Sequence, residues 1–286
     1  MSISNSLDIK PLSAAVGAVV SGVDLREPVD EDALATMRTA LGEHGVLVFR
    51  DQDLTPDQHL AFAKQWSNVN INRFFTPVDG HPEIAEVLKE PDQQRNIGGG
   101  WHTDHSYDTE PAMGSMLFAR EVPPHGGDTL FASMFEAYEA LSDGLKEMLG
   151  GLNAVHSSRH VFGPGARRYA DPGNDIGTRI GNQELATQDA VHPVVIKHPI
   201  SGRKSLYVNP GFTVRFDCWT DEESAPLLAY LYKHAAMPEF TGRLNWEKGS
   251  LAFWDNRATW HYALNDYQGH RRHLHRITLE GEALHR

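Results

Sequence analysis

The chain has 286 residues and a formal net charge of −12, and its 40% hydrophobic and 22% charged content is ordinary for a globular protein. The acidic balance argues against a general nucleic-acid binder, because phosphates are neutralised by clustered Lys and Arg. No apolar run approaches the roughly 18 residues of a membrane span, no secretory signal is recognised, and the single Cys218 excludes an internal disulfide, so a cytoplasmic location is expected.

The first predicted elements are a helix and a buried strand. Leu34, Met37 and Leu41 recur at helical spacing, and Gly45 is a typical helix end. The apolar residues 46–49 that follow read as a short strand.

Two more helix starts carry the pattern of a capping box, in which two side chains satisfy free backbone N–H groups reciprocally. Thr55 and Gln58 form the first, with Pro56 in the first helical position. Ser133 and Glu136 repeat the pattern before a further helix or a pair of short ones.

The remaining segments read mostly as strands. They are short, rich in β-branched or aromatic residues, and bounded by Gly, Pro, Asn and Asp. They cover residues 115–122, 128–132, 192–199, 204–209, 250–256 and 273–281. Many short strands with a few peripheral helices favour a mainly β jelly-roll (cupin-like) barrel over a doubly wound sheet. Without repeats or a long linker, a single domain over 1–286 is the simplest organisation.

One late helix interrupts the strands, and its start is ambiguous. Thr220 with Glu223 would cap it, but Pro226 would then lie in the second turn, where proline costs stability. We prefer Ser224 as the N-cap, because Pro226 then falls in the first turn.

The stretch GGGWHTDHSYD, residues 98–108, places His102 and Asp104 two positions apart. In an extended segment such residues point to the same face. An imidazole and a carboxylate side by side are two ligands for Fe, Mn or Zn. By itself the pair also fits a solvated turn, because the chain has 16 histidines.

A third ligand and an anion site are suggested near the C-terminus. His261 follows an apolar strand and a polar turn. If the segment after it is a strand, Arg272 and Arg276 share a face with Leu274 and Thr278. On the inner face of a barrel these guanidiniums would need an anion, and arginine holds carboxylates bidentately.

These parts together resemble the taurine/2,4-dichlorophenoxyacetate dioxygenase (TauD/TfdA) family of Fe(II)- and 2-oxoglutarate-dependent oxygenases. The resemblance covers nearly the whole chain. It is carried by the order and spacing of the blocks GVDLREP, VLVFRDQDLTPDQ, WHTD, PPHGGDTLFASM, HPVVIKHPISGRKSLYVNPGFT and WDNRATWHYALNDYQGHRRHLHR. The resemblance implies a double-stranded β-helix, the jelly-roll barrel of this family.

The resemblance also implies a metal site and its cofactors. His102, Asp104 and His261 match the two-histidine, one-carboxylate triad that holds Fe(II) and leaves coordination positions open. Those positions are for 2-oxoglutarate, the cosubstrate, and for O2, and ascorbate is the expected reductant in vitro. Arg272 and Thr129 match the residues that bind the far carboxylate of 2-oxoglutarate.

The implied reaction hydroxylates an unactivated C–H bond of a small, anionic organic substrate, with release of succinate and CO2. A sulfonate, sulfate or aryloxy group on the hydroxylated carbon would then leave. Arg276 matches an arginine that binds the substrate's sulfonate in the taurine enzyme, although it could instead pair with a nearby carboxylate. The expected partners are this small organic acid and further copies of the chain in a homo-oligomer, with no nucleic acid and no membrane.

The substrate side departs from the taurine enzyme. Asn72, Phe75 and Gly98 stand where that enzyme uses a histidine, a tyrosine and an asparagine to contact taurine. Taurine is therefore expected to be a poor substrate. Phe75, Phe212 and Trp260 are candidate walls for a larger or more aromatic acid, although aromatic residues near a barrel mouth often simply pack in the core.

Two other functions remain open from the sequence. The same His, Asp and His could hold zinc and a hydroxide for hydrolysis, although a hydrolase does not need Arg272 with Thr129. A non-catalytic jelly-roll binder could keep the barrel without the chemistry.

Overall fold

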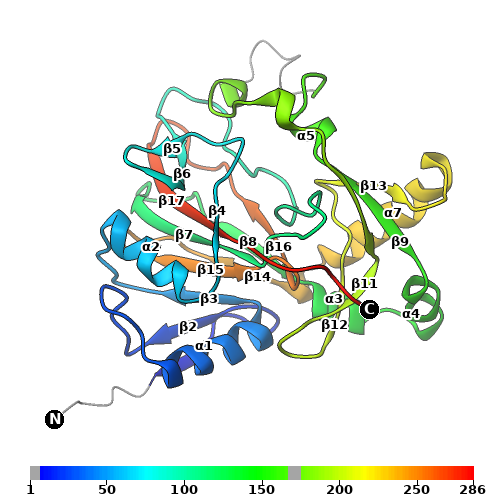
Figure 1. Cartoon of the computed structure of the whole chain (residues 1–286), viewed down its shortest axis with the longest axis horizontal. Helices are drawn as coiled ribbons and strands as arrows, with labels where there is room; N and C mark the ends of the chain where they lie inside the picture. The colour runs from blue at the N-terminus through cyan, green and yellow to red at the C-terminus, as the bar shows by residue number, and fades with distance from the viewer. Residues whose placement is uncertain (1–6, 167–174) are drawn as a thin grey trace.

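The computed structural model describes residues 7–166 and 175–286. It is mainly β, with a few helices at its periphery (Figure 1). In this described part, no helix is long and apolar enough to cross a membrane.

The helices and strands follow the chain in this order. The helices are α1 (Glu31–His44), α2 (Pro56–Lys64), α3 (Met134–Glu139), α4 (Asp143–Gly150), α5 (Arg159–Phe162) and α7 (Asp221–Ala235), with short 3-10 turns η1 (Asp175–Thr178), η2 (Gln183–Leu185) and η3 (Pro238–Phe240). The strands are β1 (Asp8–Pro11), β2 (Ala18–Ser21), β3 (Val46–Phe49), β4 (Val69–Asn70), β5 (Pro77–Val78), β6 (His81–Lys89), β7 (Gly114–Glu121), β8 (Thr129–Ser133), β9 (Asn153–Ser157), β10 (Asp189–Pro193), β11 (Val195–Lys197), β12 (Lys204–Leu206), β13 (Thr213–Phe216), β14 (Thr241–Leu244), β15 (Leu251–Asp255), β16 (Thr259–Ala263) and β17 (Arg272–Leu279).

The described strands form one large sheet and several small ones. The large sheet has nine strands in the order β1-β2-β3-β15-β7-β17-β6-β5, with β4 paired to β17. The sheet β14-β8-β16 has three strands. Strands β10-β9-β13 and β11-β12 form the other two sheets.

The large sheet has a hydrophobic core on each of its two faces. Alternate residues of each strand point to opposite faces, so one strand contributes to both cores. On β17, Ile277 and Leu279 pack in a core cluster that includes Leu34 and Phe62 of α1 and α2. Leu274 packs on the opposite side, in a cluster that includes residues of β8 and β14. The three-stranded sheet β14-β8-β16 therefore covers the inner face of the large sheet, and Figure 1 shows α1 and α2 lying outside it.

The expected N-terminal elements are confirmed. Helix α1 ends at Gly45, whose φ of 71° suits glycine. Helix α2 begins with the capping box of Thr55 and Gln58. Ser133 caps α3 by accepting the backbone N–H of Glu136, and α3 and α4 are the expected pair of short helices.

The start predicted for the late helix is wrong. Thr220 is the N-cap of α7 and forms a full capping box with Glu223, so Pro226 lies inside the helix. Ser224 is unable to serve as the cap, because it is buried and its hydroxyl accepts the backbone N–H of Phe216 at 3.0 Å. The capping box and the acidic first turn offset the hydrogen bond that proline removes.

One strand prediction also needs correction, and one long strand was missed. The segment 192–199 is not one strand: it is divided between β10 and β11, which belong to different sheets. The nine-residue strand β6 was not predicted, because its sequence HPEIAEVLK alternates weakly and contains Pro82.

Candidate active site

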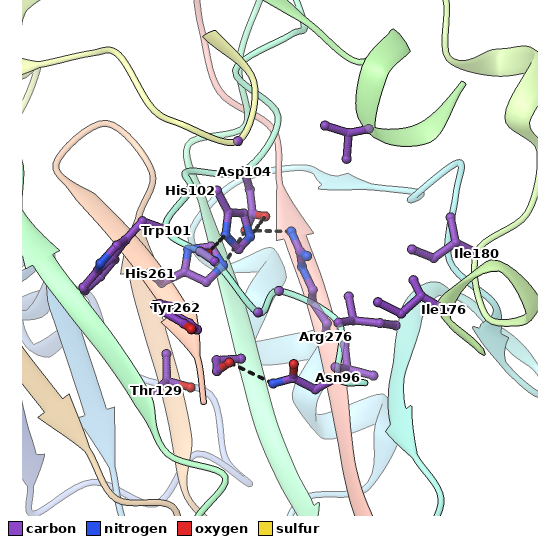
Figure 2. Close-up of a pocket in the computed structure, with 18 of the residues that line it drawn as sticks. Asn96, Trp101, His102, Asp104, Thr129, Ile176, Ile180, His261, Tyr262 and Arg276 are labelled. Carbon is purple, nitrogen blue, oxygen red and sulfur yellow. Dashed lines mark hydrogen bonds and ion pairs between the residues drawn. The ribbon is translucent and has the colours of Figure 1, made fainter. Parts of the chain in front are cut away.

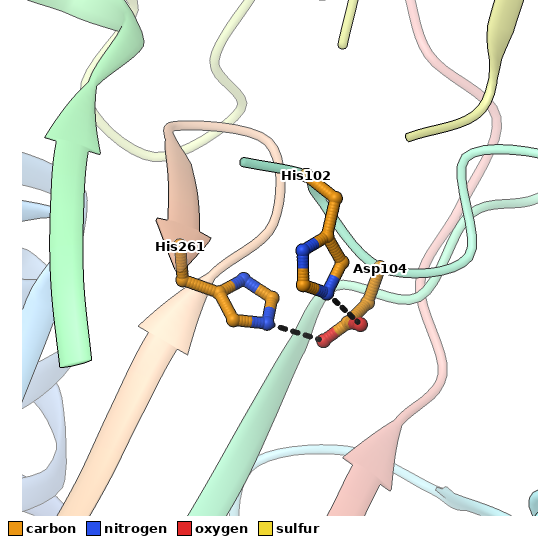
Figure 3. A group of neighbouring side chains, drawn as sticks. All are labelled: His102, Asp104 and His261. Carbon is orange, nitrogen blue, oxygen red and sulfur yellow. Dashed lines mark ion pairs between the residues drawn. The ribbon is translucent and has the colours of Figure 1, made fainter. Parts of the chain in front are cut away.

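Three side chains that could together hold a metal ion converge between the two main sheets. His261 lies on β16, and His102 forms an isolated β-bridge with it. Asp104 lies in the turn that follows, so only the first part of the predicted extended segment is extended. The bridge and the turn together bring the carboxylate beside both rings (Figure 3).

The donor atoms of this triad are close enough to share one ion. Nε2 of His102 lies 3.7 Å from Asp104 Oδ1, and Nε2 of His261 lies 3.8 Å from Asp104 Oδ2. One ligand atom from each residue lies within 4.8 Å of the others. Nδ1 of His102 is 2.8 Å from the carbonyl of Gly100 and donates to it, which leaves Nε2 without a proton and able to bind a metal.

The charges of the triad also suit a metal. Burial alone would raise the pKa of Asp104, but Arg276, followed by His261 and His102, holds it below its ordinary value. Burial, with His102 nearby, lowers the pKa of His261 well below its ordinary value. The site therefore offers one carboxylate and, at His261, a neutral imidazole, which are the forms that bind metals.

Arg276 contacts this triad directly. Its Nη2 lies 2.8 Å from Asp104 Oδ2 and 3.1 Å from Ser115 Oγ, and that hydroxyl lies 3.0 Å from the same carboxylate oxygen. The guanidinium also lies 5.7 Å from the ring centre of Phe75. The carboxylate that the sequence left open as a partner for Arg276 is thus the aspartate of the triad itself.

Arg272 lies on the same face of β17, as expected, but in a different environment. It is only 4% exposed, and among the described residues its Nε and Nη2 have no hydrogen-bond partner. The rings of Trp246 and Tyr267 lie 5.7 and 6.0 Å from its guanidinium. Thr129 Oγ1 accepts a hydrogen bond from Trp246 Nε1 at 2.9 Å, so its own hydroxyl hydrogen remains free to donate.

These orphaned donors fit an anionic ligand. A buried guanidinium with unsatisfied N–H groups is costly unless an anion completes it. Arg272 and Thr129 both line the pocket that contains the triad. The chain therefore has the donors to hold a carboxylate some distance from a metal, which is what a diacid such as 2-oxoglutarate requires.

A single pocket of about 860 Å³ joins these groups. Asn72, Phe75, Gly98 and Phe212, the expected substrate-side residues, all line it. Figure 2 shows Thr129 below the triad in this view, and Ile176 and Ile180 to its right. The apolar side of the pocket belongs to a separate hydrophobic cluster that includes Phe74, Phe75, Ile97, Tyr107, Val161, Phe162, Ile176, Ile180 and Phe212.

Gly98 is required by its position. Its φ is 80°, and a Cβ there would lie 3.4 Å from Cε1 of His102. A side chain at this position would thus be strained by the backbone conformation, and its Cβ would contact the ring of His102. Trp260, by contrast, packs in the core and donates to the carbonyl of Val208, so it is not one of the pocket walls.

Sequence reasoning missed three polar residues of the site. Ser115 bridges Asp104 and Arg276, and no sequence signal marks it within an apolar strand. Asn96 donates to the backbone carbonyl of Ala263 at 2.8 Å. His105 also lines the pocket, and its place next to the metal motif was the only available signal.

Comparisons with known proteins agree with this geometry. Residues 8–278 match the model of the "Taurine catabolism dioxygenase TauD, TfdA family". An alkylsulfatase of Acinetobacter baylyi is 35% identical, over 96% of this chain and 86% of that protein. An alpha-ketoglutarate-dependent sulfate ester dioxygenase of Pseudomonas putida is 33% identical, over 96% and 90%. The crystal structure of a taurine dioxygenase from Burkholderia xenovorans superimposes with a TM-score of 0.81 at 37% identity, over 98% and 92%.

The family match, the similarity along almost the whole length of these relatives, and the candidate metal centre with its anion site all agree. The chain belongs to the TauD/TfdA family and is an Fe(II)- and 2-oxoglutarate-dependent dioxygenase.

Proposed function

We propose that this enzyme hydroxylates a small organic anion, with an alkyl sulfate ester as the substrate class, and that the hydroxylated product then loses inorganic sulfate. Two observations support this class. The relatives from Acinetobacter baylyi and Pseudomonas putida are named an alkylsulfatase and a sulfate ester dioxygenase, and part of the pocket wall is a cluster of apolar side chains. Such a wall suits an alkyl chain better than the short, charged taurine.

In this proposal, His102, Asp104 and His261 hold Fe(II), and Arg272 with Thr129 binds the far carboxylate of 2-oxoglutarate. The observation that carries the proposal is the unsatisfied guanidinium of Arg272 in the same pocket as the triad. Fe(II) with 2-oxoglutarate and O2 would supply the oxidant that hydroxylates a C–H bond, with release of succinate and CO2. A zinc hydrolase would leave Arg272 without a role.

The residues of the chain then have three tasks. Arg272 and Thr129 orient the cosubstrate, and Arg276 attracts the anionic end of the substrate. The apolar wall holds the alkyl chain and excludes water from the reacting carbon. Hydroxylation of the carbon that bears the sulfate would yield an unstable product that expels sulfate and leaves an aldehyde.

The test is an oxygen-consumption assay with Fe(II), 2-oxoglutarate and ascorbate as reductant. Hexyl sulfate, hexanesulfonate, phenoxyacetate and taurine serve as candidate substrates. We expect hexyl sulfate to give succinate and sulfate in equal amounts, and taurine to give little of either product. Sulfate released without O2, or with Zn(II) in place of Fe(II), would instead show a hydrolase.

The proposal extends to the architecture. We propose that the nine-stranded sheet and the sheet β14-β8-β16 are the two walls of a jelly-roll in one catalytic domain. The core cluster shared between these sheets supports it.

A further inference from the structure

A chain of four polar side chains, Asn72, His105, Asp108 and Arg73, borders the substrate side of the pocket. Asn72 and His105 line the pocket itself. His105 is 3% exposed, and its φ of 56° lies in the left-handed region that residues other than glycine rarely adopt. A strained, buried histidine beside a metal ligand requires an explanation beyond packing.

The hydrogen bonds assign the orientation of the Asn72 amide. Its Oδ1 accepts the backbone N–H groups of Phe74 and Phe75 at 2.9 and 3.2 Å. The other end of the amide is therefore Nδ2, a donor, and it lies 3.5 Å from His105 Nε2. This nitrogen of the imidazole must then be the acceptor.

The other side of His105 agrees with this assignment. Its Nδ1 lies 2.9 Å from Asp108 Oδ2, and a carboxylate can only accept, so Nδ1 carries the hydrogen. Arg73 Nη2 lies 2.7 Å from each oxygen of Asp108 and places a positive charge beside that carboxylate. We call this hydrogen-bonded chain of Asn72, His105, Asp108 and Arg73 the relay. Its two ends require the same tautomer of His105, with the hydrogen on Nδ1 and a lone pair on Nε2.

The relay leaves one polar group for a ligand. Asn72 Nδ2 carries two hydrogens, and among the described residues His105 is its only hydrogen-bond partner. Asn72 and Arg276 both line the pocket, and Phe75 contacts both, through its backbone N–H to the amide oxygen and through its ring 5.7 Å from the guanidinium. Both groups are donors, and an oxygen-rich anionic group such as a sulfate is complementary to them.

We propose that His105 is a specificity-determining positioning residue, which fixes Asn72 as a hydrogen-bond donor toward the anionic group of the substrate. The proposal deepens the proposed function and rests on it for the identity of the ligand. Without the lone pair of His105, the amide would be held only by the two backbone N–H groups that its Oδ1 accepts, and its Nδ2 would lose its partner. Arg73 and Asp108 set the tautomer, and they act only through His105.

The first test does not depend on any substrate. Long-range 1H–15N NMR of the protein near neutral pH reports which imidazole nitrogen carries the hydrogen, and His105→Phe identifies the signal by its loss. We expect the signal to show hydrogen on Nδ1 and an unprotonated Nε2. Hydrogen on Nε2 would overturn the relay, whatever the enzyme oxidises.

The second test is a double-mutant cycle on the binding of hexyl sulfate to the enzyme loaded with Mn(II) and 2-oxoglutarate without O2. Asn72→Ser keeps an oxygen for the backbone N–H groups and removes the amide donor, and His105→Phe keeps a ring beside Tyr107. Each change is expected to weaken binding about tenfold, the usual size for a hydrogen bond to a charged group. The double variant should be no weaker than Asn72→Ser alone, because His105 acts through Asn72.

Two controls separate the possible failures. His81→Phe makes the same replacement at a histidine that pairs with Asp57 outside the pocket, and it should leave binding unchanged. In every variant, the affinities for Mn(II) and 2-oxoglutarate should match those of the wild-type enzyme. Unchanged affinities would show that the metal site is intact. Additive losses in the cycle would contradict the positioning role. If the wild-type enzyme does not bind hexyl sulfate, the proposed substrate class is wrong. The NMR measurement of the His105 tautomer then still tests the relay by itself.

Discussion

Two arginines on one face of β17 show opposite ways of burying a guanidinium. Arg276 and Arg272 are 8% and 4% exposed. Arg276 has its anion inside the protein, in the carboxylate of Asp104 at 2.8 Å. Arg272 has aromatic rings around it and unpartnered nitrogens. The first is neutralised by the fold, and the second is ready for a ligand.

The difference follows from what each arginine contacts. Burial lowers the pKa of Arg272, and the opposing effects of Tyr267 and Asp128 are smaller. Since an arginine does not lose its proton in a protein, Arg272 stays charged and is able to bind a carboxylate that enters the pocket. At Arg276, a substrate anion has to compete with Asp104 or share the guanidinium with it.

The largest expected effect comes from Asp104→Ala, which removes a metal ligand and the partner of Arg276 together. Turnover should vanish, and metal affinity should fall by more than about 100-fold, because even changes beyond the direct ligands cost roughly 10–100-fold. Mn(II) binding and succinate release measure the two losses. Asp92→Ala, at an exposed turn, is the control. Wild-type activity in metal-controlled buffer would show that the triad is assigned wrongly.

Replacing Arg272 with methionine should separate the two arginines by function. We expect the 2-oxoglutarate concentration for half-maximal rate to rise roughly 100-fold, because a charge-assisted, bidentate interaction is lost. Arg276→Met should change this concentration little and should weaken hexyl sulfate binding instead. Titrations of both ligands check the split, and the reverse pattern would exchange the two roles.

The same two variants should change stability in opposite directions in the metal-free protein. Arg276→Met leaves Asp104 buried without its cation, and removing one partner of a buried pair costs roughly 3 kcal/mol. Arg272→Met removes a buried charge that has no anion, so a gain of roughly 1 kcal/mol is expected. Urea unfolding without ligands measures both. A loss of stability in Arg272→Met would mean that its charge is compensated within the fold.

A pH-dependent effect is expected at His59, another buried base, which lies on α2. Both of its ring nitrogens lack hydrogen-bond partners within the described chain, and burial, aided by His275 and Arg120, lowers its pKa to about 3. Unlike Arg272, it avoids the cost of a buried charge by staying neutral. Its unfolded form gains a proton below about pH 6.5, so stability is full above that pH and is lost as the pH falls toward 3.

His59→Leu tests this sign. Between pH 6 and pH 4 the wild-type free energy of unfolding should decrease by up to about 1.4 kcal/mol per pH unit on account of this residue. In His59→Leu, the free energy of unfolding should decrease less between pH 6 and pH 4, because only the other titrating groups still contribute to the decrease. Denaturant unfolding at several pH values measures the slopes, and equal slopes would rule out His59 as a source of acid sensitivity.

Local patterns predicted much of the secondary structure and part of the site. The capping boxes at Thr55 and Ser133 and the stop at Gly45 are local, so they appear in the sequence. The alternation along β17 correctly placed Arg272 and Arg276 on one buried face. The start of α7 was mistaken, because the hydroxyl of Ser224 is used by Phe216, which packs against it from a neighbouring strand.

By itself, the sequence determined the periodic elements, the residue types of the triad and the family resemblance, because these depend on neighbouring positions and on the order of motifs. Only the tertiary structure decided which charges are compensated. Asp104 meets Arg276, and Asn72 meets His105, across separations of 172 and 33 residues. Such contacts depend on how sheets and turns pack in space, and no local pattern encodes whether a buried cation finds its anion within the chain or must take it from a ligand.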